Sequence, residues 1–117
     1  MVAGPGRVAV FTEPYARAAF EALGGEGVGW RNALAPRLLF ALPRYREGTA
    51  ANLHMPVLMC LGDHDLQASS RYAAHIASLM PRVEIRRYPV GHFDVYLGTL
   101  WDEICSAQAE FLHRHLL

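Results

Sequence analysis

Hydrophobic positions are irregularly spaced in the first third of the chain and regularly spaced in the last two thirds. Residues 56–61, Pro-Val-Leu-Met-Cys-Leu, form a continuous apolar run that ends at Gly62. Such a run is typical of a strand that is buried on both faces of a parallel sheet. Residues 83–88 alternate instead, with Val83 and Ile85 separated by a charged residue, and predict a second strand nearer the edge of the sheet.

Each predicted strand is followed by a stretch with helical spacing. Ser69 or Ser70 can cap a helix between the two strands, and Pro81 closes it. The apolar face of this helix would carry Tyr72, Ile76 and Leu79. After the second strand, Thr99 and Asp102 have the spacing of a capping box at the start of a last helix. The inner stripe of the last helix would consist of Trp101, Ile104, Cys105, Gln108, Phe111 and Leu112. This order predicts an α/β fold with a C-terminal βαβα unit and a right-handed crossover.

The segment 1–52 holds most of the glycines and predicts an irregular, partly helical region. Residues 8–11 could form a short strand, and residues 12–14 look like the start of a helix with proline in its first turn. The helix would end at the glycine pair 24–25. Its apolar face would carry Ala16, Ala19, Phe20 and Leu23. Residues 30–45, interrupted by two prolines, predict one kinked helix or two short ones.

The composition is that of an ordinary soluble globular domain. The 117 residues are 52% hydrophobic and 19% charged, with formal net charge zero. All eleven basic residues are arginines, and they are dispersed along the chain, so nothing predicts binding to nucleic acid. Cys60 and Cys105 lie in apolar runs and need no disulfide, which suits a reducing cytoplasm. Since no segment looks like a signal sequence or a membrane span, we expect a soluble cytoplasmic protein that does not enter a membrane.

Two short polar motifs directly follow the predicted strands. Gly62-Asp63-His64-Asp65 follows the first strand, and Gly91-His92 follows the second. Because parallel strands end at the same edge of a sheet, we expect Asp65 and His92 to lie together there. A carboxylate that accepts a hydrogen bond from one ring nitrogen of histidine fixes its tautomer, while the other nitrogen can take a proton from a nucleophile. Histidine suits this role because its unperturbed pKa is about 6.5.

With these motifs, residues 53–117 resemble the C-terminal end of an α/β-hydrolase. The stretch from Met55 to Asp65, a helix, Arg86-Arg-Tyr-Pro-Val-Gly-His92-Phe-Asp and a long terminal helix follow one another as in that family. In α/β-hydrolases the triad acid follows a late strand, and the histidine lies in the loop after the last strand. The resemblance implies that Asp65 is the triad acid and His92 the triad base. Residues 1–52 resemble, more weakly, the variable segment before the acid strand, which often forms a lid over the pocket.

The chain departs from that family in lacking a nucleophile. The family's early strands, its oxyanion-hole loop and its Gly-x-Ser-x-Gly turn have no counterpart in this sequence. The serines present are Ser69, Ser70, Ser78 and Ser106, all expected on helices or their caps. A second apolar set, which could be core or could line an acyl or aromatic pocket in a lid, consists of Trp30, Leu34, Leu38, Leu39 and Phe40.

Other polar residues are weaker candidates for the site. Asp63 is the rival acid, although the family pattern favours the fourth position of its motif, and its alternative role is that of a solvated turn residue. Asp94 is expected to cap the turn after His92 rather than to join the triad. A metal site built from His54, residues 63–65 and His92 is conceivable, but adjacent turn residues seldom converge on one ion, so we expect no metal. The histidines at positions 113 and 115 suit the negative end of the last helix dipole.

Two hypotheses about function follow. In the first, the chain is the C-terminal part of a serine-type hydrolase that acts on small esters, amides or similar acyl compounds without a cofactor. The chain would then be inactive alone and would pair with a missing N-terminal part that supplies the nucleophile. In the second, the chain is a complete protein that has lost catalysis and that binds a partner or self-associates through an exposed sheet edge.

Overall fold

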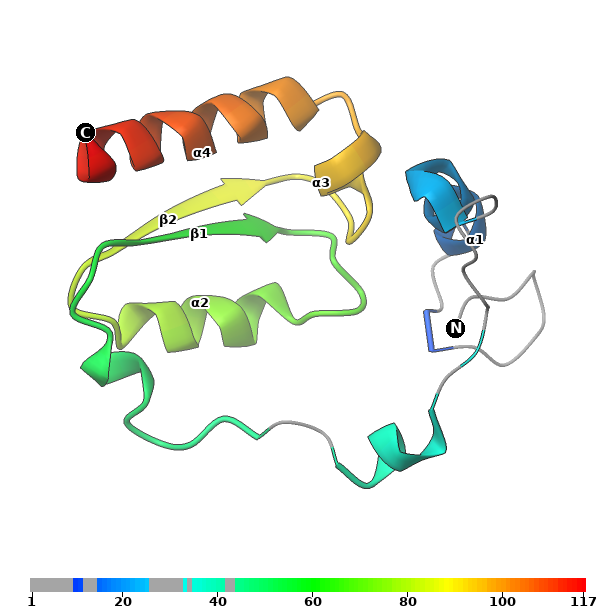
Figure 1. Ribbon diagram of the computed structural model, residues 1–117, viewed down its shortest axis with the longest axis horizontal. Coiled ribbons are helices and arrows are strands. Elements are labelled where there is room, and N and C mark those ends of the chain that lie inside the picture. Colours follow the sequence, from blue (N-terminus) through cyan, green and yellow to red (C-terminus); the bar gives the residue numbers. More distant parts are fainter. Residues whose placement is uncertain (1–9, 12–14, 26–32, 34, 42–43) are drawn as a thin grey trace. The chain divides into compact units, whose positions relative to one another are not determined.

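The computed structural model of the chain describes residues 10–11, 15–25, 33, 35–41 and 44–117 (Figure 1). The chain divides into two compact units, Met1–Arg44 and Tyr45–Leu117. The described residues contain helices and a parallel sheet, which confirms the predicted α/β fold class.

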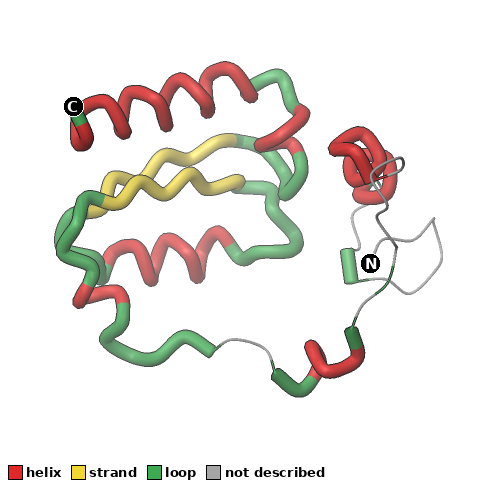
Figure 2. The backbone as a smooth tube through the Cα atoms, viewed as in Figure 1, coloured by secondary structure: helices red, strands yellow, loops and turns green. Residues whose placement is uncertain are grey.

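The second unit has two parallel strands with a helix on either side. The strands are β1 (Val57–Gly62) and β2 (Val83–Tyr88), and residue 57 is the partner of residue 83. Helix α2 (Ser70–Ser78) connects the strands, and α4 (Trp101–Leu116) follows the second strand. Figures 1 and 2 show α2 and α4 on opposite faces of the strand pair. The βαβα order and the bounds of the second strand are therefore as the sequence predicts.

Strand β1 is less buried than its apolar sequence predicts. Leu61 and Gly62, at its carboxyl end, are buried, but residues 57–60 are only half-buried. In the part of the chain that the structure describes, the sheet contains β1 and β2 alone, so the outer edge of β1 has no neighbouring strand there. A strand needs neighbours on both sides as well as cover on both faces to be fully buried.

Helix α2 begins as predicted, but its packing face differs from the prediction. The Ser69 hydroxyl accepts a hydrogen bond from the backbone N–H of Tyr72 and caps the helix. Tyr72 and Leu79, predicted to face inward, are exposed, whereas Ala77 is fully buried. The small Ala77 side chain allows the helix to lie close against a narrow sheet that cannot cover the larger side chains.

The start of α4 does not use the predicted capping box. A short helix, α3 (Asp94–Leu97), precedes it, and the N-cap residue is Leu100, with no side-chain cap hydrogen bond. The backbone instead turns directly from α3 into α4, and the N–H of Trp101 donates to the C=O of Gly98 at 3.1 Å. This backbone bond satisfies the N–H of the first helical residue, one of the groups that has no partner within the helix.

The core of the second unit joins β2, the loop after it and α4. Tyr88, Val90 and Ile104 are buried together, and Cys60 is among the half-buried residues that pack against them. Of the predicted inner stripe of α4, Ile104 is buried and Cys105 and Phe111 are half-buried. Trp101, Gln108 and Leu112 are exposed, because the two-stranded sheet is narrower than the apolar stripe.

The first unit is described only in part. Helix α1 (Ala16–Phe20) continues as a π-helical turn, η1 (Glu21–Gly25), in which Gly24 has a φ of 98°. This positive φ ends the helix at the predicted glycine pair. A 3-10 helix, η2 (Pro36–Leu39), follows. Residues 8–9 of the predicted strand, the helix start at residues 12–14, and Trp30, Leu34 and Pro43 lie outside the described residues.

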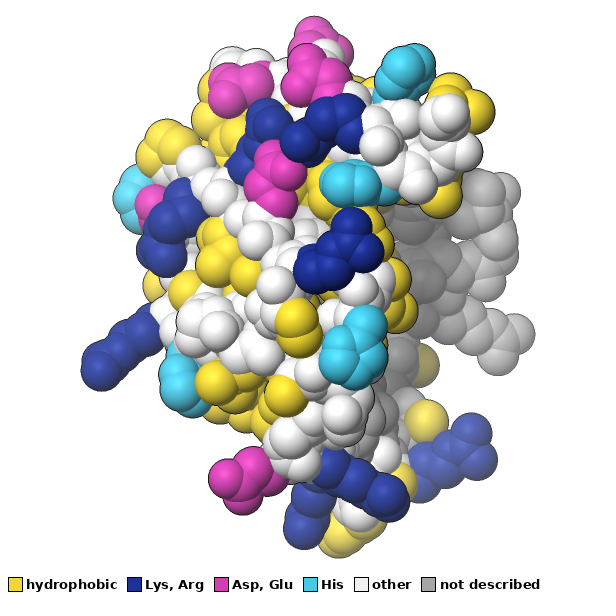
Figure 3. All heavy atoms as spheres, turned by 90° about the vertical axis from the view of Figure 1, so that its left-hand side faces the viewer, with side chains coloured by type: hydrophobic (Ala, Val, Ile, Leu, Met, Phe, Trp, Pro, Cys, Tyr) yellow, Lys and Arg dark blue, Asp and Glu magenta, His cyan; other side chains and the backbone are white. Residues whose placement is uncertain are grey.

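Of the predicted apolar faces in the first unit, part is buried. Ala16 and Ala19 are buried, whereas Leu23 and Phe40 are exposed. No described helix is long and apolar enough to cross a membrane. In the upper part of the face shown in Figure 3, basic and acidic side chains lie beside one another. In the second unit Glu84 illustrates this arrangement, because it pairs with both Arg86 and Arg114.

Ile104 is the largest fully buried side chain among the described residues, at 2% exposure. We expect Ile104→Ala to lower the free energy of unfolding by about 2–5 kcal/mol, because it removes buried methyl groups and leaves a cavity. The matched change Leu116→Ala, at a residue 75% exposed on the same helix, should cost less than about 0.5 kcal/mol. Urea unfolding followed by circular dichroism measures both values, and equal losses would contradict a core that contains Ile104.

Candidate active site

The candidate site lies where both strands end. Because β1 and β2 are parallel, their carboxyl ends meet at one edge of the sheet, and each continues into a polar loop. Two backbone hydrogen bonds join the loops: the N–H of Asp63 donates to the C=O of Tyr88 at 2.8 Å, and that of His64 donates to the C=O of Val90 at 3.0 Å. These bonds extend the contact between the strands into the loops.

Gly62 allows the loops to approach so closely. It is buried at the end of β1, and a Cβ at this position would lie 2.7 Å from the backbone oxygen of Val90. Real Cβ atoms essentially never come so near to another heavy atom. The glycine of the first motif therefore has a packing role, because any side chain would push the two loops apart.

Asp65 uses its two carboxylate oxygens for different partners. Oδ1 accepts hydrogen bonds from the backbone N–H groups of Gln67 and Ala68, at 2.7 and 2.8 Å. Oδ2 lies 3.0 Å from Nδ1 of His92, a residue 27 positions further along the chain. The loop's own backbone thus holds one oxygen in place and leaves the other directed at the histidine.

The ionised form of Asp65 is favoured at this position. Burial by itself raises the pKa of the carboxyl group, but the hydrogen bonds from Ala68, His92 and Gln67 together lower the pKa below its ordinary value of 3.8. An ionised carboxylate can only accept hydrogen bonds, so the proton in the contact with neutral His92 is on Nδ1. The remaining ring nitrogen, Nε2, is then the basic atom of that tautomer.

The surroundings of His92 are partly apolar and partly open. The His92 side chain is 31% exposed, whereas that of Asp65 is 14% exposed. The ring of the buried Phe93 meets the imidazole edge-on, with 5.0 Å between ring centroids and 90° between planes. Asp65 is therefore shielded while the imidazole still reaches solvent. The sequence did not predict the contact with Phe93, and the adjacency of the two residues was the only available signal.

The other acidic candidates face different partners. The Asp63 carboxylate pairs with the guanidinium of Arg87, so it is an ion-paired turn residue. Oδ2 of Asp94 accepts a hydrogen bond from the backbone N–H of Gly91 at 2.8 Å, in agreement with its predicted role in the turn around His92. Of the three carboxylates near the strand ends, Asp65 is thus the one that we assign to Nδ1 of the imidazole.

The remaining candidates lie elsewhere in the fold. The histidines at 113 and 115 are in the last turn of α4, where a cation would favour the helix dipole. Among the described residues, no group of three or more His, Cys, Asp or Glu side chains could hold a metal ion. Ser69 caps α2, Ser70 and Ser78 lie within that helix, and Ser106 lies within α4. None of the four serines therefore lies on a turn that follows a strand.

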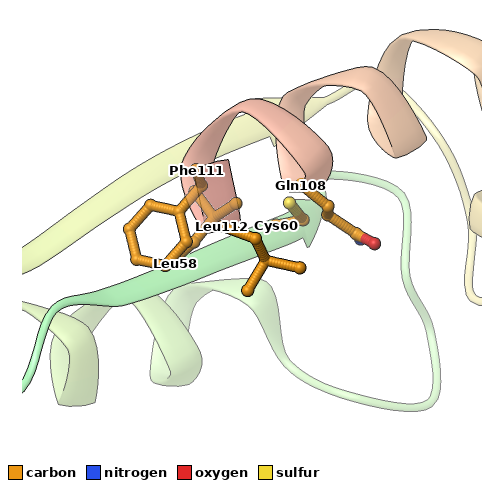
Figure 4. A pocket seen from close by; sticks show the side chains of 5 residues that line it. All are labelled: Leu58, Cys60, Gln108, Phe111 and Leu112. Carbon is orange, nitrogen blue, oxygen red and sulfur yellow. The ribbon is translucent and has the colours of Figure 1, made fainter. Parts of the chain in front are cut away.

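A hollow lies elsewhere on the second unit. About 430 Å³ in volume, it is lined by Leu58, Cys60, Gln108, Phe111 and Leu112 (Figure 4). These residues come from β1 and α4, so the hollow lies on the α4 face of the first strand. Asp65 and His92 are not part of its lining.

The chain is similar to a curated protein of greater length. The chain is 32% identical over 115 residues to a protein named quorum-quenching protein AidA, from Acinetobacter baumannii (strain MDR-ZJ06). The aligned region covers 97% of this chain and 38% of that protein, so the chain spans about two fifths of the relative's length. The chain matches no protein-family model and no solved structure.

The lowered pKa of Asp65 predicts how stability depends on pH. A carboxyl group whose folded-state pKa is lowered stabilises the fold above its unfolded-state pKa, and this contribution is lost as pH falls through the folded-state pKa. Asp65→Asn should therefore be less stable than the wild type at pH 5–7, and the difference should shrink below about pH 4.

Urea unfolding between pH 7 and pH 2.5 measures this difference. Asp102→Asn, which changes an exposed acid in the first turn of α4, is the matched control and should show a smaller pH-dependent difference. A stability difference between wild type and Asp65→Asn that stays constant down to pH 2.5 would contradict the lowered pKa.

Proposed function

We propose that this chain supplies the acid and the base of a Ser-His-Asp triad, as the C-terminal part of a serine-type α/β-hydrolase. The observation that carries the proposal is the 3.0 Å contact between Nδ1 of His92 and Oδ2 of Asp65. An acid that orients a histidine through Nδ1 and leaves Nε2 for proton transfer is the arrangement that such a triad requires. The shared strand edge and the order acid, then histidine, also support it.

The chemistry assigned to the chain is proton transfer. Nε2 of His92 takes the proton of a serine hydroxyl as the serine oxygen attacks the acyl carbon, and Asp65 stabilises the imidazolium that forms. Nε2 then returns the proton to the leaving alcohol or amine, which leaves an acyl-enzyme. In the second half, Nε2 takes a proton from water as the water oxygen attacks the acyl carbon. The bond from that carbon to the serine oxygen then breaks, the serine oxygen takes the proton back from Nε2, and the carboxylic acid is released.

The nucleophile in this proposal comes from another part of a longer protein. The four serines of the chain lie on helices or a helix cap, and the relative AidA is more than twice as long as the aligned region. A longer protein has room for the early strands, the oxyanion hole and the nucleophile turn of a hydrolase. The chain alone is then a partial site, with acid and base but nothing to attack the substrate.

The substrate class follows from the chemistry and from the relative's name. A triad of this type acts on esters, amides and similar acyl compounds. The name of AidA refers to quorum quenching. We therefore choose as test substrates small signalling molecules that carry an ester, lactone or amide bond. No cofactor is needed for this reaction.

The proposal predicts that the 117-residue chain does not turn over substrate through His92. With p-nitrophenyl acetate, wild type and His92→Ala should hydrolyse at the same background rate, and His75→Ala serves as a control at an exposed histidine on α2. A fluorophosphonate probe should label none of the four serines. Robust turnover that disappears in His92→Ala would refute the claim that the nucleophile is missing.

The complete reading frame that contains this chain provides the positive test. If it encodes a Gly-x-Ser-x-Gly turn upstream, the full product should hydrolyse acyl esters. His92→Ala and Asp65→Asn should then lower kcat by roughly 10³-fold or more, as removal of triad members does in serine hydrolases. His75→Ala should leave kcat unchanged. An active full product that tolerates His92→Ala would contradict the proposed base.

A second candidate function, self-association without catalysis, is favoured by the outer edge of β1, which no strand pairs with in the described part of the chain. The N–H of Val57 donates to Arg82, and that of Asp63 donates to Tyr88, so alternate residues of the strand face β2. The backbone groups of Leu58 and Cys60 therefore point to the outer edge. The sequence of β1 contains no charge and no proline, the features that usually protect such an edge.

In a dimer about a two-fold axis, β1 of one copy would pair with β1 of the other, antiparallel and centred on Met59. Leu58 would then lie opposite Cys60 of the second copy, and the hollows beside α4 would adjoin one another.

Light scattering after size exclusion should give twice the 13.0 kDa mass of the chain. Leu58→Lys should shift the species to monomer, whereas Ile85→Lys, on the other strand, should not. A wild-type monomer at about 100 µM would rule out this association.

A further inference from the structure

The loop that carries His92 is closed by a carboxylate that the proposed triad does not use. Oδ2 of Asp94 accepts a hydrogen bond from the backbone N–H of Gly91 at 2.8 Å. This bond spans His92 and Phe93 and joins the residue before them to the residue after them. Asp94 is also the first residue of α3, and its backbone C=O accepts from the N–H of Gly98 at 2.8 Å. The side chain therefore fastens the histidine loop to the start of a helix.

The loop is also held on its other side. The C=O of Val90, one residue before Gly91, accepts a hydrogen bond from His64 in the acid loop at 3.0 Å. Val90 and Phe93 are both buried, and the Phe93 ring lies edge-on to the imidazole. The backbone before His92 is thus tied to the acid loop, and the backbone after it is anchored by a buried ring. The bond between Asp94 and Gly91 connects these two fixed points.

We propose that Asp94 is a positioning residue, whose hydrogen bond to Gly91 holds the His92 loop in the conformation that directs Nδ1 at Asp65. The inference rests on the proposed function, in which Asp65 and His92 act as a pair. Asp94 acts through the backbone of the loop, not on the reacting atoms. Its chemical requirement is an oxygen acceptor of the right length, because the group that it binds is a neutral backbone N–H.

This role has a spectroscopic consequence. While Nδ1 of His92 donates to Asp65, the neutral imidazole is held as the Nδ1–H tautomer. Without the bond between Asp94 and Gly91, the loop can move and the contact with Asp65 is lost. The imidazole then exchanges its proton between both nitrogens, as a solvated ring does. The ring nitrogen chemical shifts of His92 distinguish one fixed tautomer from an exchanging mixture.

Nitrogen-15 NMR of the histidine rings in the 117-residue chain is the test, with the His92 signals assigned from His92→Ala. Wild type should show a single Nδ1–H tautomer at a pH where the imidazole is neutral. Asp94→Ala should lose that signature and give averaged shifts. Asp94→Asn should retain it, because its side-chain oxygen can still accept from Gly91. Asp102→Ala, at an acid in the first turn of the next helix, should behave as wild type.

The outcomes separate this inference from the function on which it rests. A fixed tautomer in the wild type that persists in Asp94→Ala overturns the positioning role but leaves the Asp65–His92 pair intact. An exchanging mixture in the wild type overturns both. Unfolding of Asp94→Ala, seen as loss of amide dispersion, overturns the inference too, because Asp94 would then support the fold and not the orientation of one ring. Loss of the tautomer in Asp94→Asn, with the fold intact, would show that an acceptor alone is insufficient and would also contradict it.

Discussion

Parallel pairing of β1 with β2 is the constraint on which the second unit depends. In this register residue 62 lies opposite residue 88, so both strands end together and their loops leave the sheet side by side. Backbone bonds from Asp63 and His64 continue the contact into the loops. A buried glycine at the end of β1 permits the close approach. An antiparallel pair would have placed these loops at opposite ends of the sheet.

The Asp65–His92 contact depends on how each side chain is held by its own loop. A carboxylate that is partly removed from water is costly unless hydrogen bonds replace the lost hydration. The backbone N–H groups of Gln67 and Ala68 provide that replacement at one oxygen, so the other is presented to the histidine in a fixed direction. On the other side, Asp94 closes the histidine loop through Gly91. Hydrogen bonds within each loop therefore flank the contact between Asp65 and His92, at the strand ends that the parallel pairing brings together.

Several local features could be read from the sequence because their causes are local. The bounds of β2 follow from its alternation, and Ser69 caps α2 because a hydroxyl before a helix can bind its first free N–H. The inward faces of the helices could not be read as well. Tyr72 is exposed although it has helical spacing, because the apolar pattern cannot show that the described sheet has only two strands. The predicted capping box is absent because the short helix α3, which the sequence pattern did not predict, directly precedes α4 and sets the path of the backbone into it.

For the candidate site, the sequence by itself determined the positions of the candidate residues, an acid and a histidine that each follow a strand. It also placed these residues at a common edge, because parallel strands end together. Only the tertiary structure decided which carboxylate faces the imidazole. Asp63 turns to Arg87, Asp94 turns to Gly91, and Asp65 meets His92. The reason is physical. The direction of each side chain depends on hydrogen bonds within and between loops that are distant in the sequence, and the pattern of residues along one strand does not predict those bonds.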